Sequence, residues 1–221
     1  MRKNQTTISL FPLPEVVLFP GMSLPLYIFE DRYKKLILNC LELESDKKFG
    51  IVYAEDNSCA EVGTIAEILD VEKLEDGRMN VLTEGKGRFK ILEFLSEEPY
   101  FKALIEPYDD KDVEIDDALD KSLKQIRKLS TKALKMFDKV SDQELSKNLK
   151  LPSDPKELLF LVAGNLTCTI EEKQDILEMQ SLRERSEKVL TLLNEEIQKL
   201  EVMLENKATK DEVVKNGKLK I

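Results

Sequence analysis

The chain offers few residues whose types and spacing could carry out catalysis. It contains no histidine, which excludes Ser-His-Asp and Cys-His arrangements and any zinc site built on imidazole. Gly85-Lys86-Gly87 lacks the Ser or Thr that a phosphate-binding P-loop requires directly after Gly-Lys. Carboxylate pairs such as Glu97-Glu98 are typical of solvated surface, and no serine stands out as the partner of a particular lysine. The sequence therefore predicts a protein that is not an enzyme and needs no metal or other cofactor.

The cysteines and the longest apolar run indicate the compartment. Cys40, Cys59 and Cys168 are too far apart for a CxxC pair, and an odd number of cysteines without an export signal favours reduced thiols. The apolar stretch from Leu10 to Gly21, LFPLPEVVLFPG, contains a glutamate and three prolines. It is therefore neither a membrane span nor a signal peptide. We expect a soluble, cytoplasmic protein.

Charge is distributed unevenly along the chain. Residues 1–110 contain 13 Lys/Arg and 21 Asp/Glu, a net charge of −8, whereas residues 111–221 contain 21 and 22, a net charge of −1. Nucleic-acid binding depends on clustered cations that contact phosphates, and anionic membranes attract polybasic segments. The sequence therefore predicts neither nucleic acid nor membrane as a partner.

The first half of the chain shows the period-2 apolar pattern of short strands, interrupted by one helix. The predicted strands are Thr6–Phe11, Ser23–Phe29, Phe49–Tyr53, Gly63–Leu69, Arg78–Thr83, Arg88–Phe94 and Tyr100–Ile105. Pro25 predicts a position at a sheet edge or at a bulge, because proline cannot donate a ladder hydrogen bond. Asp76-Gly77 predicts a hairpin, and Gly85-Lys86-Gly87 a second tight connection. The helix begins at Asp31 and has apolar residues at helical spacing through Leu41.

The second half changes to a helical period. The acidic run Asp109–Asp112 predicts a boundary between a barrel or bent sheet over residues 1–110 and a helical bundle over 111–205. One helix is expected from Ile115 to Phe137, a second after the cap Asp154-Pro155, and a third from Glu171 to about Glu205. The third helix has apolar residues three and four apart, which favours a bundle over a coiled coil: Leu190, Leu193, Ile197, Leu200 and Leu204. Residues 206–221 lack periodicity and are expected to fray.

Several ordered motifs resemble those of the Lon protease N-terminal domain family. The opening signature is Leu10-Phe11-Pro12-Leu13-Pro14, Val17-Leu18-Phe19-Pro20-Gly21 and the run from Leu24 to Tyr33. The later matches are Phe49-Gly50-Ile51-Val52, Val62-Gly63-Thr64, Asp76-Gly77-Arg78, Gly85, Arg88-Phe89 and Glu172-Lys173-Gln174. The resemblance covers residues 8–205 and implies an α+β protein, with a PUA-like β-barrel followed by an all-α bundle that ends in a long helix.

The resemblance also implies a function. In the full protease this region recognises substrates and helps to assemble the ring, while the ATPase and peptidase domains lie downstream. The chain looks most like the stand-alone Lon-domain proteins of cyanobacteria and plastids. Tyr27 stands where the family commonly has histidine, so a role that needs imidazole does not carry over. PUA-like folds often bind RNA, but the net charge of −8 weighs against that alternative here.

The proline-bent apolar rim is the candidate peptide-binding surface, although each of its residues can instead be part of the core. Its residues are Leu13, Val17, Phe19, Leu24, Leu26, Tyr27 and Phe29. The motif residues with expected structural roles are Pro20, Gly21, Glu30, Arg32, Tyr33, Gly50, Gly63, Gly77, Arg78, Gly85, Arg88 and Phe89. We expect Glu30 to pair with one of these three arginines and so hold the helix against the barrel.

These observations favour a non-catalytic module that binds unfolded or flexible polypeptide segments. An acidic surface favours clients that are both basic and apolar. The alternative is an assembly module, in which residues 171–205 associate with a second copy or with a Lon-type protease. A helix face more apolar than the bundle can cover would favour this alternative.

Overall fold

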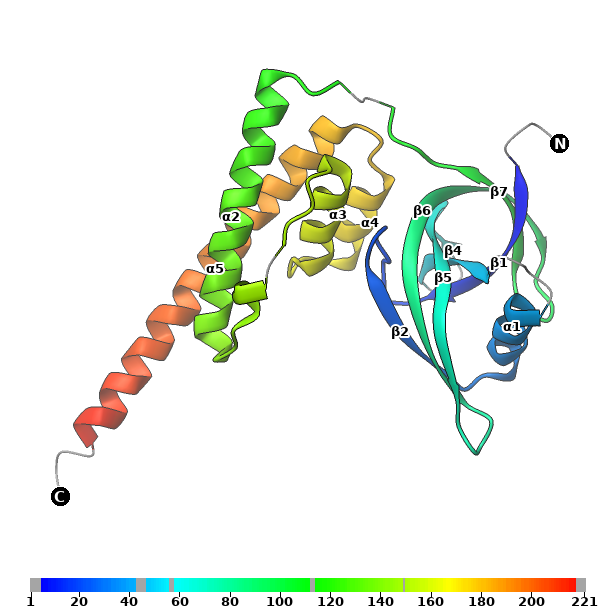
Figure 1. Cartoon of the computed structure of the whole chain (residues 1–221), viewed down its shortest axis with the longest axis horizontal. Coiled ribbons are helices and arrows are strands. Elements are labelled where there is room, and N and C mark those ends of the chain that lie inside the picture. Colours follow the sequence, from blue (N-terminus) through cyan, green and yellow to red (C-terminus); the bar gives the residue numbers. More distant parts are fainter. Residues whose placement is uncertain (1–4, 43–46, 56–57, 112–113, 149, 218–221) are drawn as a thin grey trace. The chain divides into compact units, whose positions relative to one another are not determined.

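The structure is a computed structural model that describes residues 5–42, 47–55, 58–111, 114–148 and 150–217, without the side chains of residues 148 and 210–217. Its contacts divide the chain into two compact units (Figure 1). The barrel unit consists of Met1–Asp112 and Cys168–Ser181, and the helical unit of Val113–Thr167 and Leu182–Ile221. The predicted α+β class, a barrel joined to a bundle with a long final helix, is confirmed.

The barrel unit contains a sheet that closes on itself. Its strands are β1 (Thr6–Leu13), β2 (Ser23–Ile28), β3 (Lys48–Glu55), β4 (Ser58–Cys59), β5 (Val62–Lys73), β6 (Met79–Ser96) and β7 (Lys102–Pro107). The order is β1-β7-β6-β5-β3, and a parallel pairing of β1 with β3 completes the ring. The other pairings, including that of β2 with the first half of β6, are antiparallel. Since β6 is the one strand with which β2 pairs in the described sheet, the predicted edge position of Pro25 is confirmed.

The long strand β6 contradicts one prediction from the sequence. Asp76-Gly77 does form the hairpin between β5 and β6, with Gly77 at φ +80°. Gly85-Lys86-Gly87, however, lies inside the 18 continuous residues of β6 and is not a turn. Gly85 is needed there for close approach, because a Cβ at this position would collide with the carbonyl oxygen of Phe19. The backbone of Gly85 makes two hydrogen bonds to the Gly21-Met22 turn. The Gly21 N–H donates to the Gly85 carbonyl, and the Gly85 N–H donates to the Met22 carbonyl.

Helix α1 (Asp31–Glu42) packs its apolar face into the larger of the two barrel cores. Tyr33, Leu36, Ile37 and Cys40 are buried together with residues of β1, β3, β5 and β6. The carbonyl of Glu30 accepts hydrogen bonds from the N–H groups of the third and fourth residues after it, and so begins the helix. The spacing that predicts this helix also identifies the face that it buries.

Helix α4 (Ile170–Glu178) belongs to the barrel unit, although the sequence analysis assigned it to the bundle. Thr169 and Glu172 form a capping box at its start: the Thr169 hydroxyl accepts from the N–H of Glu172, whose carboxylate accepts from the N–H of Thr169. The Gln174 amide then donates to the carbonyl of Val62 on β5, at 3.0 Å. The boundary therefore crosses the chain three times instead of once at residue 110.

The helical unit contains α2 (Asp117–Ser141), the 3₁₀ helix η1 (Leu145–Asn148), α3 (Pro155–Asn165) and α5 (Leu182–Gly217). Helices α2 and α5 run parallel, since Arg183 pairs with Asp116 near their starts and Lys207 bonds Asp142 near the end of α2. Asp154 caps α3 and Pro155 opens it, as the sequence predicts.

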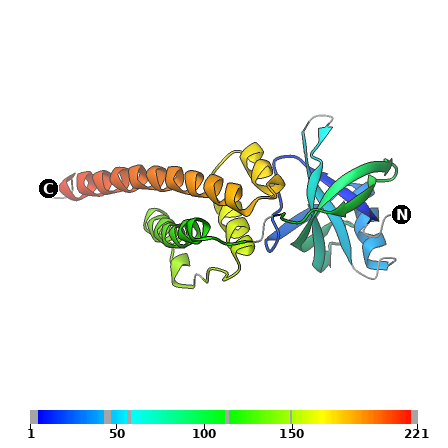
Figure 2. The same cartoon turned by 90° about the horizontal axis from the view of Figure 1, so that it is seen from above.

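The long final helix differs from the prediction at both ends. The expected helix from Glu171 to Glu205 is broken between α4 and α5, and α5 then continues to Gly217, through residues expected to fray (Figure 2). Leu193, Ile197 and Leu200 point into the unit and are buried, as a bundle helix requires. In the described part of the chain, no helix is both long and apolar enough to span a membrane.

Candidate functional site

The candidate binding surface is the outer side of the sheet where β2, β6 and β5 lie next to one another. We call it the β2 face and define it by Pro25, Tyr27, Leu82, Asp70, Glu72 and Asn80, with Phe29 directly after β2. Pro25 lies opposite Leu82, and Tyr27 opposite Asn80. The next residues of β2, Leu26 and Ile28, point the other way because successive side chains of a strand alternate between the two faces.

Two aromatic rings dominate the β2 face. Tyr27 is 47% exposed and Phe29 is 60% exposed, with their ring centroids 6.2 Å apart. The guanidinium of Arg78 lies over the Tyr27 ring, 5.3 Å from its centroid. Exposed aromatic rings beside apolar neighbours are the usual anchors of protein interfaces. This surface therefore offers apolar contact area together with a ring that already accommodates a cation.

Carboxylates border the apolar part of the β2 face. Asp70 and Glu72 on β5 lie opposite Leu82 and Asn80 and line a shallow hollow of about 280 Å³ with Tyr27. Glu72 accepts a hydrogen bond of 2.8 Å from the amide of Asn80. The face therefore combines apolar surface with negative charge, which suits a basic group better than an acidic one.

The structure separates the predicted peptide-binding residues into two groups. Tyr27 and Phe29 remain candidates because they are exposed. Phe19 is wholly buried, so its assignment to a binding surface is wrong. Leu13, Leu24 and Leu26 are half-buried and pack against the large core, and Val17 is half-buried as well.

The prediction for Glu30 is right about the ion pair and wrong about its effect. Glu30 pairs with Arg32 at 2.8 Å, and both side chains are exposed. Because Arg32 lies on α1 itself, the pair does not connect the helix to the barrel. Arg78 pairs instead with Asp76 in the hairpin turn, where both side chains are also exposed.

Arg88 is the charged motif residue that the barrel unit buries. Its guanidinium donates to Asp110 at 2.5 Å and to the carbonyls of Leu177 and Met179 at 2.5 and 2.8 Å. The Tyr108 ring lies 5.1 Å from the guanidinium carbon. Arg88 thus connects the sheet with the end of α4, a structural role that the distance in sequence conceals.

Sequence reasoning missed a second exposed apolar patch on the other half of β6. It consists of Leu92, Phe94 and Leu95, and Phe94 is 46% exposed with its ring 6.1 Å from Phe101. Register shifts at Leu92 and at Leu95 disturb the alternation that would identify the outer residues of this stretch. The patch is the natural comparison for the β2 face in any binding experiment.

Two reactive side chains, those of Cys59 and Tyr53, line another hollow of the barrel unit. Burial raises the pKa of the Cys59 thiol, so it remains protonated at neutral pH. The Tyr53 hydroxyl beside it donates to Glu55 at 2.8 Å. Within the described ranges, no cluster of three or more Cys, Asp or Glu side chains is arranged to hold a metal ion.

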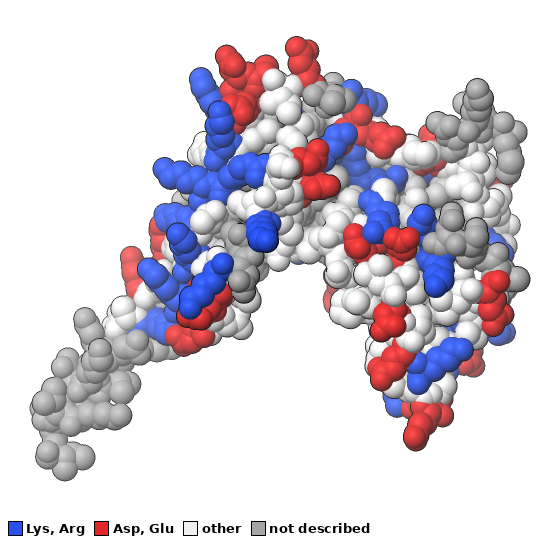
Figure 3. Space-filling view, in the orientation of Figure 1, with Lys and Arg blue, Asp and Glu red and all other residues white. Residues whose placement is uncertain are grey.

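Basic residues gather on α2 instead of on the barrel. Six exposed lysines follow one another at spacings of three and four residues: Lys121, Lys124, Lys128, Lys132, Lys135 and Lys139. On the face drawn in Figure 3, basic side chains cluster over the helical unit, whereas acidic and basic side chains are mixed over the barrel unit. The charge argument against nucleic acid therefore applies to the barrel residues alone.

Solved structures place this architecture in a known class. The N-terminal domain of the Mycobacterium avium complex Lon protease superimposes with a TM-score of 0.67 at 19% identity, covering 86% of this chain and 98% of that one. A Lon N-terminal domain protein from Xanthomonas campestris gives 0.64 at 21% identity, with 84% and 98% covered. The fold is therefore that of Lon N-terminal domains.

The sequence comparisons establish the family. The family described as "ATP-dependent protease La (LON) substrate-binding domain" matches residues 7–195, and the chain belongs to it. The Lon protease of Flavobacterium johnsoniae is 32% identical over 213 residues, which cover 91% of this chain and 26% of that protein. The Lon protease of Anaeromyxobacter dehalogenans is 31% identical, with 85% and 23% covered. The chain thus spans about a quarter of the length of these curated relatives.

Proposed function

We propose that this chain is a non-catalytic module that binds unfolded or flexible polypeptide segments on the β2 face. The observation that carries the proposal is the exposure of two neighbouring rings, Tyr27 on β2 and Phe29 directly after it, where β2 has one strand partner in the described sheet. Membership of a substrate-binding domain family supports it. So does the absence of histidine, which removes the commonest catalytic base.

Binding would bury apolar side chains of the client against the two rings and Leu82. Burial contributes about 25 cal/mol per Å² of apolar surface, and a few aromatic anchors commonly supply most of the affinity of an interface. The edge of β2 that no described strand pairs with can add main-chain hydrogen bonds to an extended client, although Pro25 offers no donor there. An unfolded segment exposes its apolar side chains and its backbone hydrogen-bonding groups, whereas a folded protein buries most of the former and pairs most of the latter.

The carboxylates determine which segments bind best. Asp70 and Glu72 lie beside the apolar surface, so a segment that combines apolar and basic residues satisfies both parts of the face. Acidic segments are repelled.

The three cysteines form no disulfide, which agrees with a reducing, cytoplasmic setting.

The test compares the β2 face with the second apolar patch. Wild-type protein, Tyr27→Ala and Phe94→Ala are titrated into a fluorescent, reduced and unfolded client, and binding is followed by anisotropy. The two aromatic residues are almost equally exposed, so the variants lose similar surface. We expect Tyr27→Ala to weaken binding at least tenfold and Phe94→Ala to leave it within twofold. The opposite pattern would place the site on the second patch, and no binding by the wild type would refute the function.

A second candidate function is assembly through α5. Val202 and Met203 are exposed apolar residues on that helix, beyond the buried Leu193, Ile197 and Leu200. A second copy or a Lon-type protease could cover them. Light-scattering mass in solution distinguishes the functions. A stable dimer that Val202→Lys/Met203→Lys dissociates would support assembly, whereas a monomer that associates with the unfolded client would support peptide recognition.

A further inference from the structure

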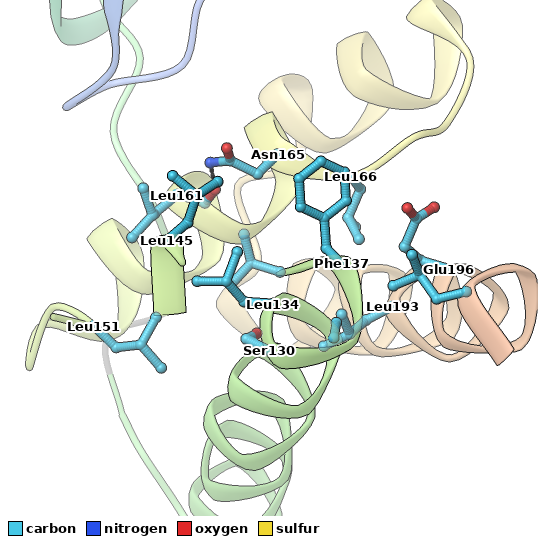
Figure 4. A pocket seen from close by; sticks show the side chains of 13 residues that line it. Ser130, Leu134, Phe137, Leu145, Leu151, Leu161, Asn165, Leu166, Leu193 and Glu196 are labelled. Carbon is cyan, nitrogen blue, oxygen red and sulfur yellow. Dashed lines mark hydrogen bonds between the residues drawn. The ribbon is translucent and has the colours of Figure 1, made fainter. Parts of the chain in front are cut away.

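The helical unit contains a hollow that the proposed peptide-binding function does not use. It has a volume of about 480 Å³ and lies among α2, η1, α3 and α5. Most of its lining is apolar: Ala133, Leu134, Phe137, Leu145, Leu151, Leu161, Val162, Leu166, Leu193 and Leu200. Figure 4 shows several of these side chains converging from α2, α3 and α5. The volume is within the range of about 300–1,000 Å³ found for small-molecule sites.

The hollow is open to solvent at one side. Phe137 is 40% exposed and Leu145 is 52% exposed, although both line it. Deeper in the unit, Leu193 and Leu200 are buried. A hydrophobic core normally fills such a space with side chains, since interiors are packed as densely as organic crystals. Here the wall includes the small side chain of Ala133, which leaves room for an apolar body to enter past Phe137.

Two buried polar atoms in the lining have no hydrogen-bond partner within the described residues. They are the hydroxyl oxygen of Ser130 on α2 and Oε2 of Glu196 on α5. The other carboxylate oxygen of Glu196 accepts a bond of 3.1 Å from the Thr167 hydroxyl. The Asn165 amide nitrogen donates to the carbonyl of Leu161, and the amide oxygen is a further acceptor in the lining. The polar part of the hollow therefore offers acceptor oxygens on Glu196 and Asn165, and a Ser130 hydroxyl that can both donate and accept.

The charge of Glu196 is not met by a cation of the described chain. No Lys or Arg in that part of the protein comes within ion-pair distance of it. Lys199, the nearest basic residue along α5, donates to the carbonyl of Thr167 at 3.1 Å instead. A buried acceptor without a partner costs free energy, which a ligand with a positively charged donor would recover.

The geometry points to a binding site for a small amphipathic amine: an aliphatic or aromatic body among the leucines, with its ammonium group at Glu196. The leucines accept the body of the ligand. The ammonium donates to Glu196 Oε2, which has no other partner among the described residues. This site lies in the helical unit, so it is separate from the β2 face and does not depend on the peptide-binding proposal.

Three probes of equal chain length test the chemistry by isothermal titration of the full chain. They are octylamine, octanol and octanoate, each used below its micelle concentration at neutral pH. We expect octylamine to bind at least tenfold more tightly than octanol, and octanoate to bind least. Equal affinity for all three would refute the role of the carboxylate. Failure of octylamine to bind would refute the site.

Variants connect this binding to the hollow. Glu196→Gln should weaken the binding of octylamine about tenfold or more and leave the binding of octanol within twofold. The reason is that charge-assisted hydrogen bonds are stronger than neutral ones. Glu195→Gln, the same change at the exposed neighbouring residue, should have no effect on either probe. Ala133→Leu should abolish binding of both by filling the space. If circular dichroism shows that Ala133→Leu does not fold, the two glutamate variants still test whether the amine binds at Glu196. Equal losses in both of them would refute the site.

Discussion

Arg88 on β6 and Asp110 after β7 form an ion pair at 2.5 Å, with both side chains almost wholly buried. Two further donor contacts of Arg88 reach carbonyls at the end of α4. Burying a charge is unfavourable unless it is paired and hydrogen-bonded, and this arginine meets both conditions. Through these contacts, Arg88 explains why α4, which begins 60 residues after Asp110, belongs to the barrel unit.

Asp110→Asn should destabilise the barrel unit strongly. The substitution removes the charge of the carboxylate that pairs with a buried guanidinium, and breaking a buried ion pair typically lowers the free energy of unfolding by about 3–5 kcal/mol. Hydrogen exchange at the amides of β5, β6 and α4 measures the change in that unit alone. The control is Asp76→Asn, which breaks the exposed pair with Arg78 and should leave exchange nearly unchanged. Equal effects of the two changes would contradict a special role for the buried pair.

Gly85→Ala should destabilise the barrel, whereas Gly87→Ala should not. A Cβ at Gly85 would collide with the Phe19 carbonyl, while one at Gly87 meets no atom within 4 Å. Overpacking of this kind costs about 1–3 kcal/mol, and a change at an open position is usually within about 0.5 kcal/mol. Urea denaturation followed by circular dichroism measures both variants, which share one strand and one substitution. Similar stabilities would show that the Phe19 segment moves aside without cost.

The parts of the fold that the sequence predicts correctly are those set by neighbouring residues. The alternation in β2, the helical spacing in α1 and the Asp154-Pro155 cap each depend on contacts within a few residues. Gly85-Lys86-Gly87 shows the opposite case. Glycine pairs are common in turns, and the backbone of Phe19 that requires glycine at this point lies more than 60 residues earlier. A local pattern therefore indicated a turn where the tertiary structure has a continuous strand.

The candidate site was predictable as a region but not residue by residue. Leu24, Leu26, Tyr27 and Phe29 are all apolar, so alternation shows that they point to opposite faces without showing which face is covered. The structure settles this by placing Leu26 against the core and Tyr27 in solvent. Likewise, the partners of Arg88 come from three separate segments, and spacing in the sequence does not identify such contacts.

Asp116 should make the stability of the helical unit depend on acid pH. It caps α2 by accepting from the Leu119 N–H at 2.9 Å and pairs with Arg183 at 2.6 Å. The backbone hydrogen bond, then the arginine, holds the pKa of this carboxyl below its usual value. Its contribution to stability is complete above the unfolded-state pKa of about 4 and is lost as the pH falls through the lower folded-state pKa.

The check compares thermal unfolding of wild type and Asp116→Asn across the acid range. Asparagine keeps an oxygen that can cap the helix but removes the charge, so the variant should be less stable at about pH 6. The difference should shrink as the pH falls below the unfolded-state pKa of about 4 and vanish once the wild-type carboxyl is protonated in the folded state. Asp117→Asn removes a neighbouring charge without either contact and should give a smaller difference. A difference that stays constant with pH would contradict the argument.

Asp70 should determine the preference for basic clients without determining binding itself. It lies opposite Leu82, next to the apolar surface that Tyr27 and Phe29 provide. Two peptides with one apolar core, carrying either two lysines or two glutamates, separate these contributions. We expect the wild type to favour the lysine peptide. Asp70→Asn should reduce that preference about two- to fivefold, because exposed ion pairs contribute at most about 1 kcal/mol. Glu75→Gln, which removes an exposed carboxylate at the hairpin tip, should leave the preference unchanged. An unchanged preference in Asp70→Asn, with binding still lost in Tyr27→Ala, would show that the face selects for apolar surface alone.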